Sequence, residues 1–136
     1  ADTYPQDAVR GPIVMVTNQW AGSDGDIVAA ATQAMGYAKV IGERSWGGVV
    51  GIDGRFDLVD GTSVTQPRYA GWYGSYGWGV ENHGVDPDIV VTVSPEDWEA
   101  DRDVQLDAAI AECLRQLDDK PAATAPELPG PAFDRC

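Results

Sequence analysis

Residues 11–36, GPIVMVTNQWAGSDGDIVAAATQAMG, decide the predicted fold of this chain. Residues 13–16 are β-branched or apolar on both faces, which is typical of a short buried parallel strand. Residues 24–35 show helical spacing of apolar side chains, with a glycine as the predicted C-cap at position 36; the spaced residues are Ile27, Val28, Ala31 and Met35. Residues 38–41 predict a second strand. Strand, helix and strand within about thirty residues make one βαβ unit, so we expect an α/β fold.

A glycine-rich β region follows this unit. Residues 47–52 and 55–59 predict strands, with Asp53-Gly54 as the hairpin signal between them. Residues 71–84 contain five glycines and four large aromatics, Trp72, Tyr73, Tyr76 and Trp78. We expect a loop there, with unusual backbone angles at the glycines and rings that hold it in place. Residues 89–91 predict a last strand.

Two helix signals occupy the C-terminal third. Ser94 is a predicted N-cap followed by Pro95 at the first helical position. Residues 103–117 predict an amphipathic helix that packs through one stripe, formed by Leu106, Ile110, Cys113, Leu114 and Leu117. The chain therefore divides into a lead-in (1–10), a folded part (11–120) and a Pro-rich tail (121–136), the tail being predicted disordered or surface-hugging.

Composition excludes several classes of function. The 136 residues are 43% hydrophobic, enough to bury a core, and 9 Lys+Arg against 22 Asp+Glu give a net charge of −13. That charge argues against nucleic acid or an anionic membrane as partner, and no apolar run approaches a membrane span of about 20 residues. Two Cys and one His are too few for a structural zinc site, so we expect no metal and no cofactor.

The cysteines and the N-terminus carry weaker expectations. Cys113 lies in the predicted helix and Cys136 is the last residue, so we expect no disulfide and a reducing, cytoplasmic setting. The sequence has no signal peptide and no initiator Met, which predicts a processed chain or a fragment.

Ser23, between the first strand and its helix, allows two interpretations. In the first, Ser23 is the helix N-cap and Asp26, three residues on, completes a capping box. In the second, Ser23 is a nucleophile, and the backbone N–H of Asp24 at the positive helix N-terminus stabilises an oxyanion. Ala21 occupies the first position of what would be Gly-x-Ser-x-Gly, so the hydrolase elbow is not expected.

A nucleophilic serine needs a base, and the candidates are few. His83 is the single histidine and is either a base or an ordinary surface residue. Glu81 would share a strand face with it, which suits a hydrogen-bonded pair or a simple polar surface. Asp53, Asp57 and Asp60 are interpreted as hairpin acids, because a calcium loop needs tighter alternation of ligands.

Segments of the chain, in order, resemble a known family. They are TNQWAGSDGD (17–26), IGERSWGGVVGI (41–52), DGT (60–62) and GVENHGVDPD (79–88). Together they resemble the C-terminal catalytic subdomain of the tricorn proteases, large cytoplasmic peptidases related to the tail-specific C-terminal processing serine peptidases. The resemblance extends over residues 11–117.

The resemblance implies roles for individual residues. Ser23 matches the family's nucleophile, and the N–H of Asp24 matches one donor of the oxyanion hole. Glu81 matches an acid that orients the catalytic base through a hydrogen-bond relay. Ile27 and Val49 are implied walls of the pocket for the residue before the scissile bond. The implied fold is the α/β crotonase- and ClpP-like arrangement of βαβ units.

The departures from the family are equally informative. Its general-base histidine, second oxyanion donor and the acid that selects basic residues all lie upstream of the matched region, and His83 does not stand where the family places its base. Residues 11–120 therefore resemble the nucleophile-bearing part of a larger catalytic domain, and the isolated chain is predicted to be inactive or nearly so. The whole enzyme would hydrolyse oligopeptides, such as proteasome products, through an acyl-enzyme. The resemblance also implies a homo-oligomer, a hexamer, and allows for aminopeptidase partners.

Two alternatives remain open. The chain could be a non-catalytic module that binds a peptide or a sister subunit through the aromatic loop 72–78. A crotonase-like acyl-CoA enzyme is disfavoured, because no basic residue accompanies the helix N-terminus to hold CoA phosphates.

Overall fold

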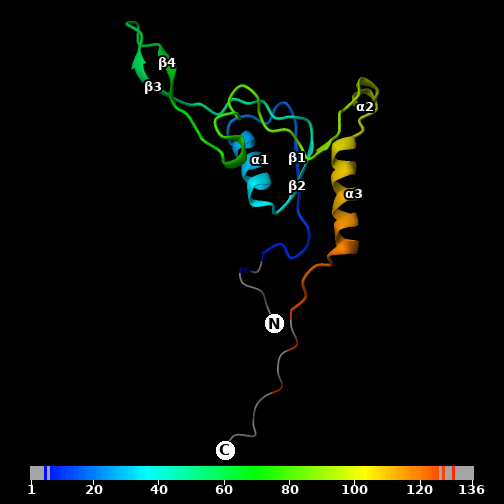
Figure 1. The fold of residues 1–136 in the computed structure, drawn as a ribbon. Coiled ribbons are helices and arrows are strands. Elements are labelled where there is room, and N and C mark those ends of the chain that lie inside the picture. The colour runs from blue at the N-terminus through cyan, green and yellow to red at the C-terminus, as the bar shows by residue number, and fades with distance from the viewer. Residues whose placement is uncertain (1–4, 6, 126, 128–129, 131–136) are drawn as a thin grey trace, which may run out of the picture.

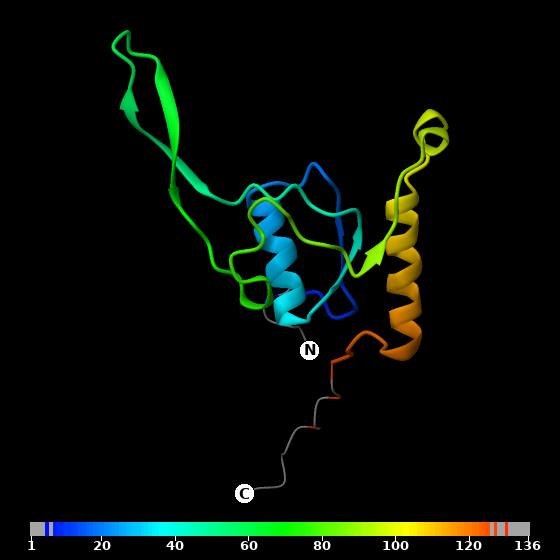
Figure 2. The same cartoon turned by 45° about the horizontal axis from the view of Figure 1, so that its top comes forward.

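A small parallel sheet lies between two helices. The computed structural model describes residues 5, 7–125, 127 and 130. Its sheet has the order β1-β2-β5, and the strands are Val14–Thr17, Lys39–Gly42 and Ile89–Val90. Helices α1 (Asp24–Met35) and α3 (Val104–Asp119) lie on opposite sides of β1 and β2 (Figures 1 and 2). The predicted βαβ unit and the α/β class are confirmed, with β1 and β2 parallel from Val14↔Lys39 to Thr17↔Gly42.

Helix α1 has its predicted ends but a different buried face. Gly36 is left-handed at φ 64°, and its N–H donates to the last-turn carbonyls of Thr32 and Gln33, which confirms the C-cap. Val28 and Met35, expected on the packed stripe, are 47% and 73% exposed. The buried residues are instead small or polar: Asp26, Ala29, Ala30 and Thr32. Of the four spaced residues, Ile27 packs against the core, so the apolar spacing was right for a helix and only partly right for its buried face.

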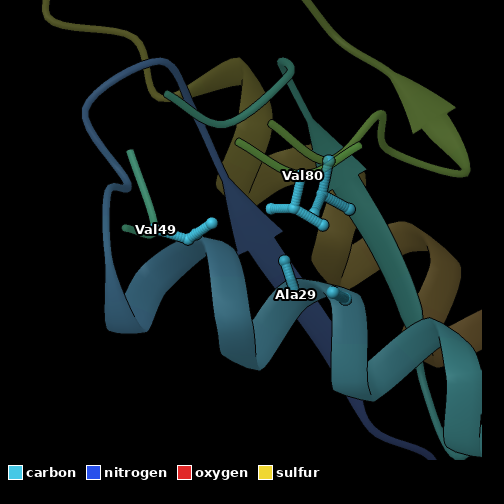
Figure 3. Close-up of a cluster of buried hydrophobic side chains, with 5 residues drawn as sticks. Ala29, Val49 and Val80 are labelled. Atoms are coloured by element: carbon cyan, nitrogen blue, oxygen red, sulfur yellow. The ribbon is translucent and has the colours of Figure 1, made fainter. Parts of the chain in front are cut away.

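The hydrophobic core joins α1 to two irregular segments rather than to the sheet alone. Figure 3 shows Val49 and Val80 directed toward the face of α1 that carries Ala29. The buried cluster consists of Ala29, Ala30, Val49, Val80 and Val85, with Met15, Ile27, Tyr73 and Tyr76 packed against it. Residues near positions 49 and 80–85 are therefore anchored by burial although they have no regular secondary structure.

An antiparallel hairpin projects away from the body (Figures 1 and 2). Its strands are β3 (Gly51–Asp57) and β4 (Ser63–Tyr69). The predicted turn at Asp53-Gly54 is wrong, because both residues lie inside β3 beside a register irregularity. The chain reverses at residues 58–62, where Gly61 has φ 82° and the Leu58 N–H donates to the Thr62 carbonyl at 2.9 Å. Strand β4 was not predicted, because its polar residues and Pro67 weaken the strand pattern.

The predicted irregular segment 71–84 is confirmed, apart from a 3-10 turn, η1 (Gly74–Tyr76). Glycines 74, 77 and 84 adopt positive φ, as expected for a loop that turns sharply. The predicted helix start at Ser94 is also confirmed, since α2 (Pro95–Glu99) has Ser94 as its N-cap and a complete capping box with Asp97.

Helix α3 presents its apolar stripe outward. Gln105 and Ala109 are buried, and the Gln105 amide donates to the Val91 carbonyl at 2.9 Å. Three members of the predicted packing stripe are about half exposed: Leu106 (50%), Ile110 (49%) and Leu114 (59%). The helix was predicted correctly, but its predicted packing stripe is only partly covered in this structure.

The described residues before β1 and after α3 form no helix or strand. Cys113 is a free, half-buried thiol. The prediction that it forms no disulfide with Cys136 is not tested, because Cys136 lies outside the described residues. The prediction of a disordered or surface-hugging tail falls largely on residues that are not described, although the Ala123 N–H donates to the Arg10 carbonyl at 3.0 Å. No helix in the described part of the chain is long and apolar enough to cross a membrane.

Candidate active site

Ser23 occupies a sharp turn at the start of α1. Its backbone has φ 52° and ψ −111°, and its side chain makes no capping hydrogen bond. The predicted capping box between Ser23 and Asp26 is therefore wrong. A non-glycine residue held at positive φ costs about 1–3 kcal/mol, and such strain concentrates at functional sites. The exposed hydroxyl thus sits on a strained strand-to-helix turn, although the Gly-x-Ser-x-Gly motif of hydrolase elbows is absent from the sequence.

The backbone around Ser23 is held by the segment 46–48. The Ser23 N–H donates to the Gly48 carbonyl at 3.2 Å, and the Trp46 N–H donates to the Ala21 carbonyl at 3.0 Å. The Trp46 ring lies so close that a Cβ added at Gly22 or Gly48 would come within 2.4 or 2.7 Å of it. Glycine at these two positions is what allows the ring to lie against both segments.

Asp26 holds the same segment through its side chain. The residue is fully buried. Its Oδ1 accepts from the Ser45 hydroxyl at 2.5 Å and from the Gly47 N–H at 2.8 Å, while Oδ2 accepts from the Gly48 N–H at 3.2 Å. These contacts replace the capping role that the spacing from Ser23 predicted. No feature of the local sequence indicated them, because the donors lie about twenty residues further along the chain.

Asp24 presents a backbone donor at the helix N-terminus. Its N–H has no acceptor among the residues that the structure describes. The end of the helix carries roughly half a positive charge, so this N–H favours a nearby anion. It directly follows Ser23, the geometry in which a serine adduct and an oxyanion donor can lie side by side.

Glu81 holds the next two residues of the same stretch, Val49 and Val50. Its Oε2 accepts from the N–H groups of Val49 and Val50, both at 2.7 Å. Its Oε1 has no hydrogen-bond partner in the described part of the chain, which leaves that oxygen available to a further group.

His83 is not paired with Glu81. The two residues lie in a turn, where the Gly84 N–H donates to the Val80 carbonyl at 2.8 Å, so the strand that would have placed them on one face does not form. His83 Nε2 instead lies 2.8 Å from Asp86 Oδ2, and the His83 carbonyl accepts from the Arg44 guanidinium. No hydrogen bond joins His83 to Ser23 in the described residues. The structure therefore orients the single imidazole through Asp86.

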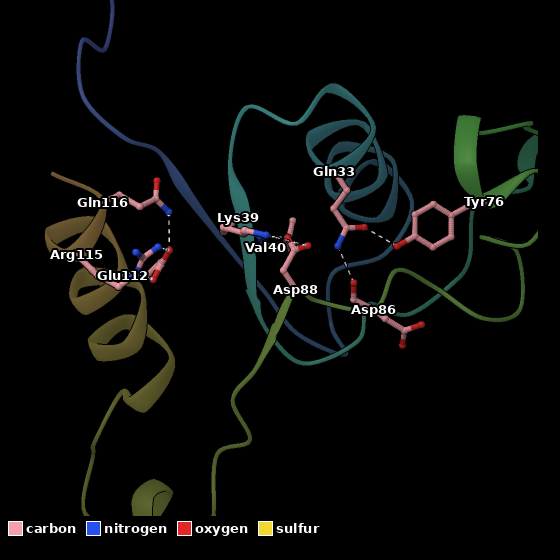
Figure 4. Close-up of polar contacts among 9 residues, drawn as sticks. All are labelled: Gln33, Lys39, Val40, Tyr76, Asp86, Asp88, Glu112, Arg115 and Gln116. Carbon is pink, nitrogen blue, oxygen red and sulfur yellow. Dashed lines mark hydrogen bonds and ion pairs between the residues drawn. The ribbon is translucent and has the colours of Figure 1, made fainter. Parts of the chain in front are cut away.

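A polar network joins the segment 76–88 to α1 and β2 (Figure 4). The Tyr76 hydroxyl donates to Gln33 Oε1 at 2.5 Å, and the Gln33 amide donates to the Asp86 carbonyl at 2.9 Å. The Asp88 carboxylate accepts from the Val40 N–H at 2.8 Å. Burial, followed by the charges of Asp86 and Asp88, raises the pKa of Tyr76 above its usual value, which keeps its hydroxyl a donor. The loop after His83 is thereby fixed to both elements.

The two proposed pocket residues lie in or beside the core. Val49 belongs to the buried cluster, and Ile27 is partly buried against it. Their role as walls of a substrate pocket stays a prediction. Within the described residues, His, Cys, Asp and Glu side chains form no group of three or more that could hold a metal ion.

Comparison with known proteins defines the family. Residues 1–91 match the model of peptidase family S41, so the chain belongs to this family. It is similar to tricorn protease homolog 1 of Streptomyces coelicolor, at 61% identity over 127 residues. It is also similar to the tricorn protease of Thermoplasma acidophilum, at 47% identity over 114 residues. These matches cover 93% and 84% of this chain but 12% and 11% of the relatives, so the chain spans about a tenth of their length.

Solved structures agree with this assignment. The crystal structure of the tricorn protease aligns with a TM-score of 0.80 at 47% identity, over 85% of this chain and 11% of that one. Mature CPAF aligns with a TM-score of 0.63 at 19% identity, over 85% of this chain and 23% of that one. At this identity the match shows a shared fold alone. The expected resemblance to the tricorn proteases is confirmed.

Proposed function

We propose that residues 11–120 are the nucleophile-bearing part of a tricorn-type serine peptidase with the crotonase- and ClpP-like arrangement. Ser23 Oγ attacks the scissile carbonyl while a base takes its proton, and the Asp24 N–H stabilises the oxyanion that forms. The proton then passes to the leaving amine, and water hydrolyses the acyl-serine to regenerate Ser23. Membership of a peptidase family supports this reaction class, as does the resemblance of residues 17–26 to the tricorn proteases.

The observation that carries the proposal is the conformation of Ser23. Its hydroxyl makes no capping bond, its backbone is held at positive φ, and the neighbouring Asp24 N–H has no acceptor among the described residues. A serine that only capped the helix would bind the N–H of the second or third helical residue. Strain maintained without such a bond is better explained by chemistry at the hydroxyl.

The general base is proposed to come from polypeptide outside this chain. His83 is engaged with Asp86, whereas Glu81 Oε1 has no hydrogen-bond partner among the described residues and could accept from an imidazole. An imidazole bound to this oxygen would be held in the orientation a base needs, which is the relay role that the resemblance implies for Glu81. The isolated chain is then expected to be inactive or nearly so.

The wider role follows from the relatives and is part of the same proposal. The substrates would be oligopeptides, such as proteasome products. The assembly would be a homo-oligomer in the cytoplasm that could work with aminopeptidases. Ile27 and Val49 would shape the pocket for the residue preceding the cleaved bond.

Fluorophosphonate labelling tests the proposal. In the full-length polypeptide that carries this chain, we expect rapid modification of Ser23, located by mass spectrometry, and none in Ser23→Ala. The 136-residue chain alone is expected to label slowly. Equally rapid labelling of the chain alone would show that a local group is the base, and loss of that labelling in His83→Ala would identify it as His83. No labelling of the full-length protein, together with no peptide hydrolysis, would refute the proposed function.

One observation favours a second candidate, the non-catalytic module. In the loop 72–78, Trp72 and Trp78 are each 64% exposed, while Tyr73 and Tyr76 pack against the core. Two rings on a fixed loop could hold an extended peptide or a sister subunit. Under this reading, Trp72→Ala together with Trp78→Ala abolishes peptide binding and Ser23→Ala changes nothing. The peptidase proposal expects Ser23→Ala to abolish turnover.

A further inference from the structure

We propose that Asp26 is a positioning residue for Ser23, acting through the Gly48 peptide. This inference rests on the proposed function, because it assumes that Ser23 is the nucleophile. Asp26 is not expected to touch the substrate. Its carboxylate binds the Gly48 N–H, and the carbonyl of the same residue accepts the Ser23 N–H.

The first step is the burial of Asp26. Its side chain is 0% exposed, yet both oxygens are satisfied, by the Ser45 hydroxyl and by the N–H groups of Gly47 and Gly48. A buried carboxylate is costly unless it is fully hydrogen-bonded. Charge-assisted bonds to backbone N–H groups are also stronger than neutral ones. The position of the 47–48 backbone is therefore tied to this carboxylate.

The second step is the connection from Gly48 to the nucleophile. Gly48 donates its N–H to Asp26 Oδ2 at 3.2 Å, and its carbonyl accepts the Ser23 N–H at 3.2 Å. The 47–48 backbone has little freedom to move away on its other side, since a Cβ at Gly47 would lie 2.5 Å from the Gly84 nitrogen. The carboxylate and the 83–84 backbone thus clamp the segment that holds Ser23 at φ 52°.

The third step separates positioning from packing. Two series of hydrogen bonds, called branches below, start at the Asp26 carboxylate. The first leads through the Ser45 hydroxyl, which accepts the Val85 N–H at 2.8 Å and so anchors a core residue. The other runs through Gly48 to Ser23. If Asp26 were merely structural, loss of its bond to Ser45 and loss of its bond to Gly48 would have similar effects. If it positions Ser23, only loss of the bond to Gly48 should slow the chemistry at Ser23.

Asp26→Asn cuts one branch selectively. The asparagine oxygen can keep the two donors at Oδ1, while its NH₂ group would then face the Gly48 N–H, donor against donor. Relaxation of Ser23 from its strained angles would displace Oγ, and a displacement of about 1 Å can cost roughly 100-fold in rate. Ser45→Ala removes the other branch and leaves both Gly contacts to Asp26 in place.

The experiment compares these variants in the full-length protein. For Asp26→Asn we expect fluorophosphonate labelling and kcat to fall at least about tenfold, with KM changed less than about twofold. Ser45→Ala should lower the melting temperature but label at a rate within about twofold of the unmodified protein. Asp97→Asn is the matched control: it also removes a hydrogen-bonded aspartate at a helix start, and labelling should not change. If Asp26→Asn lowers stability but labels like Ser45→Ala, the positioning role is overturned.

Amide hydrogen exchange tests the same link without a variant and without catalysis. If the Asp26–Gly48–Ser23 connection opens as a unit, the Gly48 and Ser23 amides should exchange at rates within about threefold of each other after correction for sequence effects. Exchange at Ser23 more than about tenfold faster than at Gly48 would overturn the link, even if Asp26→Asn failed to fold. Equal rates in a protein that never labels would refute the proposed peptidase function and leave the conformational link standing.

Discussion

The chain contains the pattern Ser-x-x-Asp twice at a helix start, and the two copies fold differently. At Ser94-Pro95-Glu96-Asp97 the Ser94 hydroxyl accepts the Asp97 N–H at 3.1 Å, and the Asp97 carboxylate accepts the Ser94 N–H at 3.2 Å. At Ser23-Asp24-Gly25-Asp26 neither bond forms. Ser94 has ordinary extended angles, φ −78° and ψ 159°, whereas Ser23 has φ 52°.

The difference lies in what surrounds each aspartate. Asp97 is bonded within its own turn and to Arg102, five residues on. Asp26 is buried against donors from the segment 45–48, which draw its carboxylate away from the helix end. One pattern therefore produces an ordinary cap where the carboxylate finds its partners in its own turn and in Arg102, and an exposed, strained serine where donors of a packed segment bind the carboxylate.

The largest contrast is expected from removing each hydroxyl. In the full-length protein, Ser23→Ala should lower peptide hydrolysis by a factor of at least about 10³. Because Ser23 makes no capping bond, its free energy of unfolding should change little. Ser94→Ala should leave hydrolysis unchanged and cost about 1 kcal/mol through loss of the cap. Peptide kinetics and chemical denaturation measure the two effects; equal losses of activity in both variants would mean that Ser23 acts only through the fold.

Glycine substitution should change stability in opposite directions. Ser23→Gly relieves the positive φ, which costs about 1–3 kcal/mol, and introduces a smaller entropic cost in the unfolded chain. We expect a gain of about 1 kcal/mol in the free energy of unfolding. Ser94→Gly should lose a few tenths of a kcal/mol, since glycine is itself a tolerated N-cap. Denaturant titration of both variants provides the measurement, and a loss at position 23 would show that its backbone is not strained.

The smallest expected effect is the pH response of the ordinary cap. The Ser94 hydroxyl, and then the Arg102 guanidinium, hold the pKa of Asp97 below its usual 3.8. Because the folded-state pKa is lowered, this contribution to stability is present above about pH 4 and is lost as pH falls through the folded value. Asp97→Asn should therefore flatten the loss of stability below about pH 4. Unchanged acid sensitivity in this variant would show that the Asp97 charge contributes nothing measurable.

The sequence predicted the bounds of helices and strands better than it predicted which face of each helix is buried. The strand at 13–16, the helix at 24–35 and the helix at 103–117 appear within two residues of their predicted bounds. Those bounds depend on local signals, such as Gly36 at the end of α1 and Asp103 at the start of α3. The buried faces of α1 and α3 were predicted only in part, since Met35 and Ile110 are exposed while Ala29 and Ala109 are buried. Spacing shows that a helix is amphipathic, but the partner determines which side chains fit.

The site divides in the same way. Ser23, Asp24 and Glu81 could be named from the motif match, because a short segment at a fixed position carries them. The buried role of Asp26, the binding of Glu81 to the Val49 and Val50 N–H groups, and the pairing of His83 with Asp86 could not. Most of these contacts join positions roughly twenty to thirty residues apart, and no local propensity encodes such a distance.

By itself, the sequence determined the βαβ unit, the positions of its helices and the membership of a peptidase family, because periodicity, end signals and motif order are written locally. Tertiary structure alone decided that the serine at the start of α1 is strained and exposed while the one at the start of α2 is an ordinary cap. The physical reason is that different donors compete for the Asp26 carboxylate. Three donors from the segment 45–48 stabilise it more than the single backbone N–H that a capping box offers.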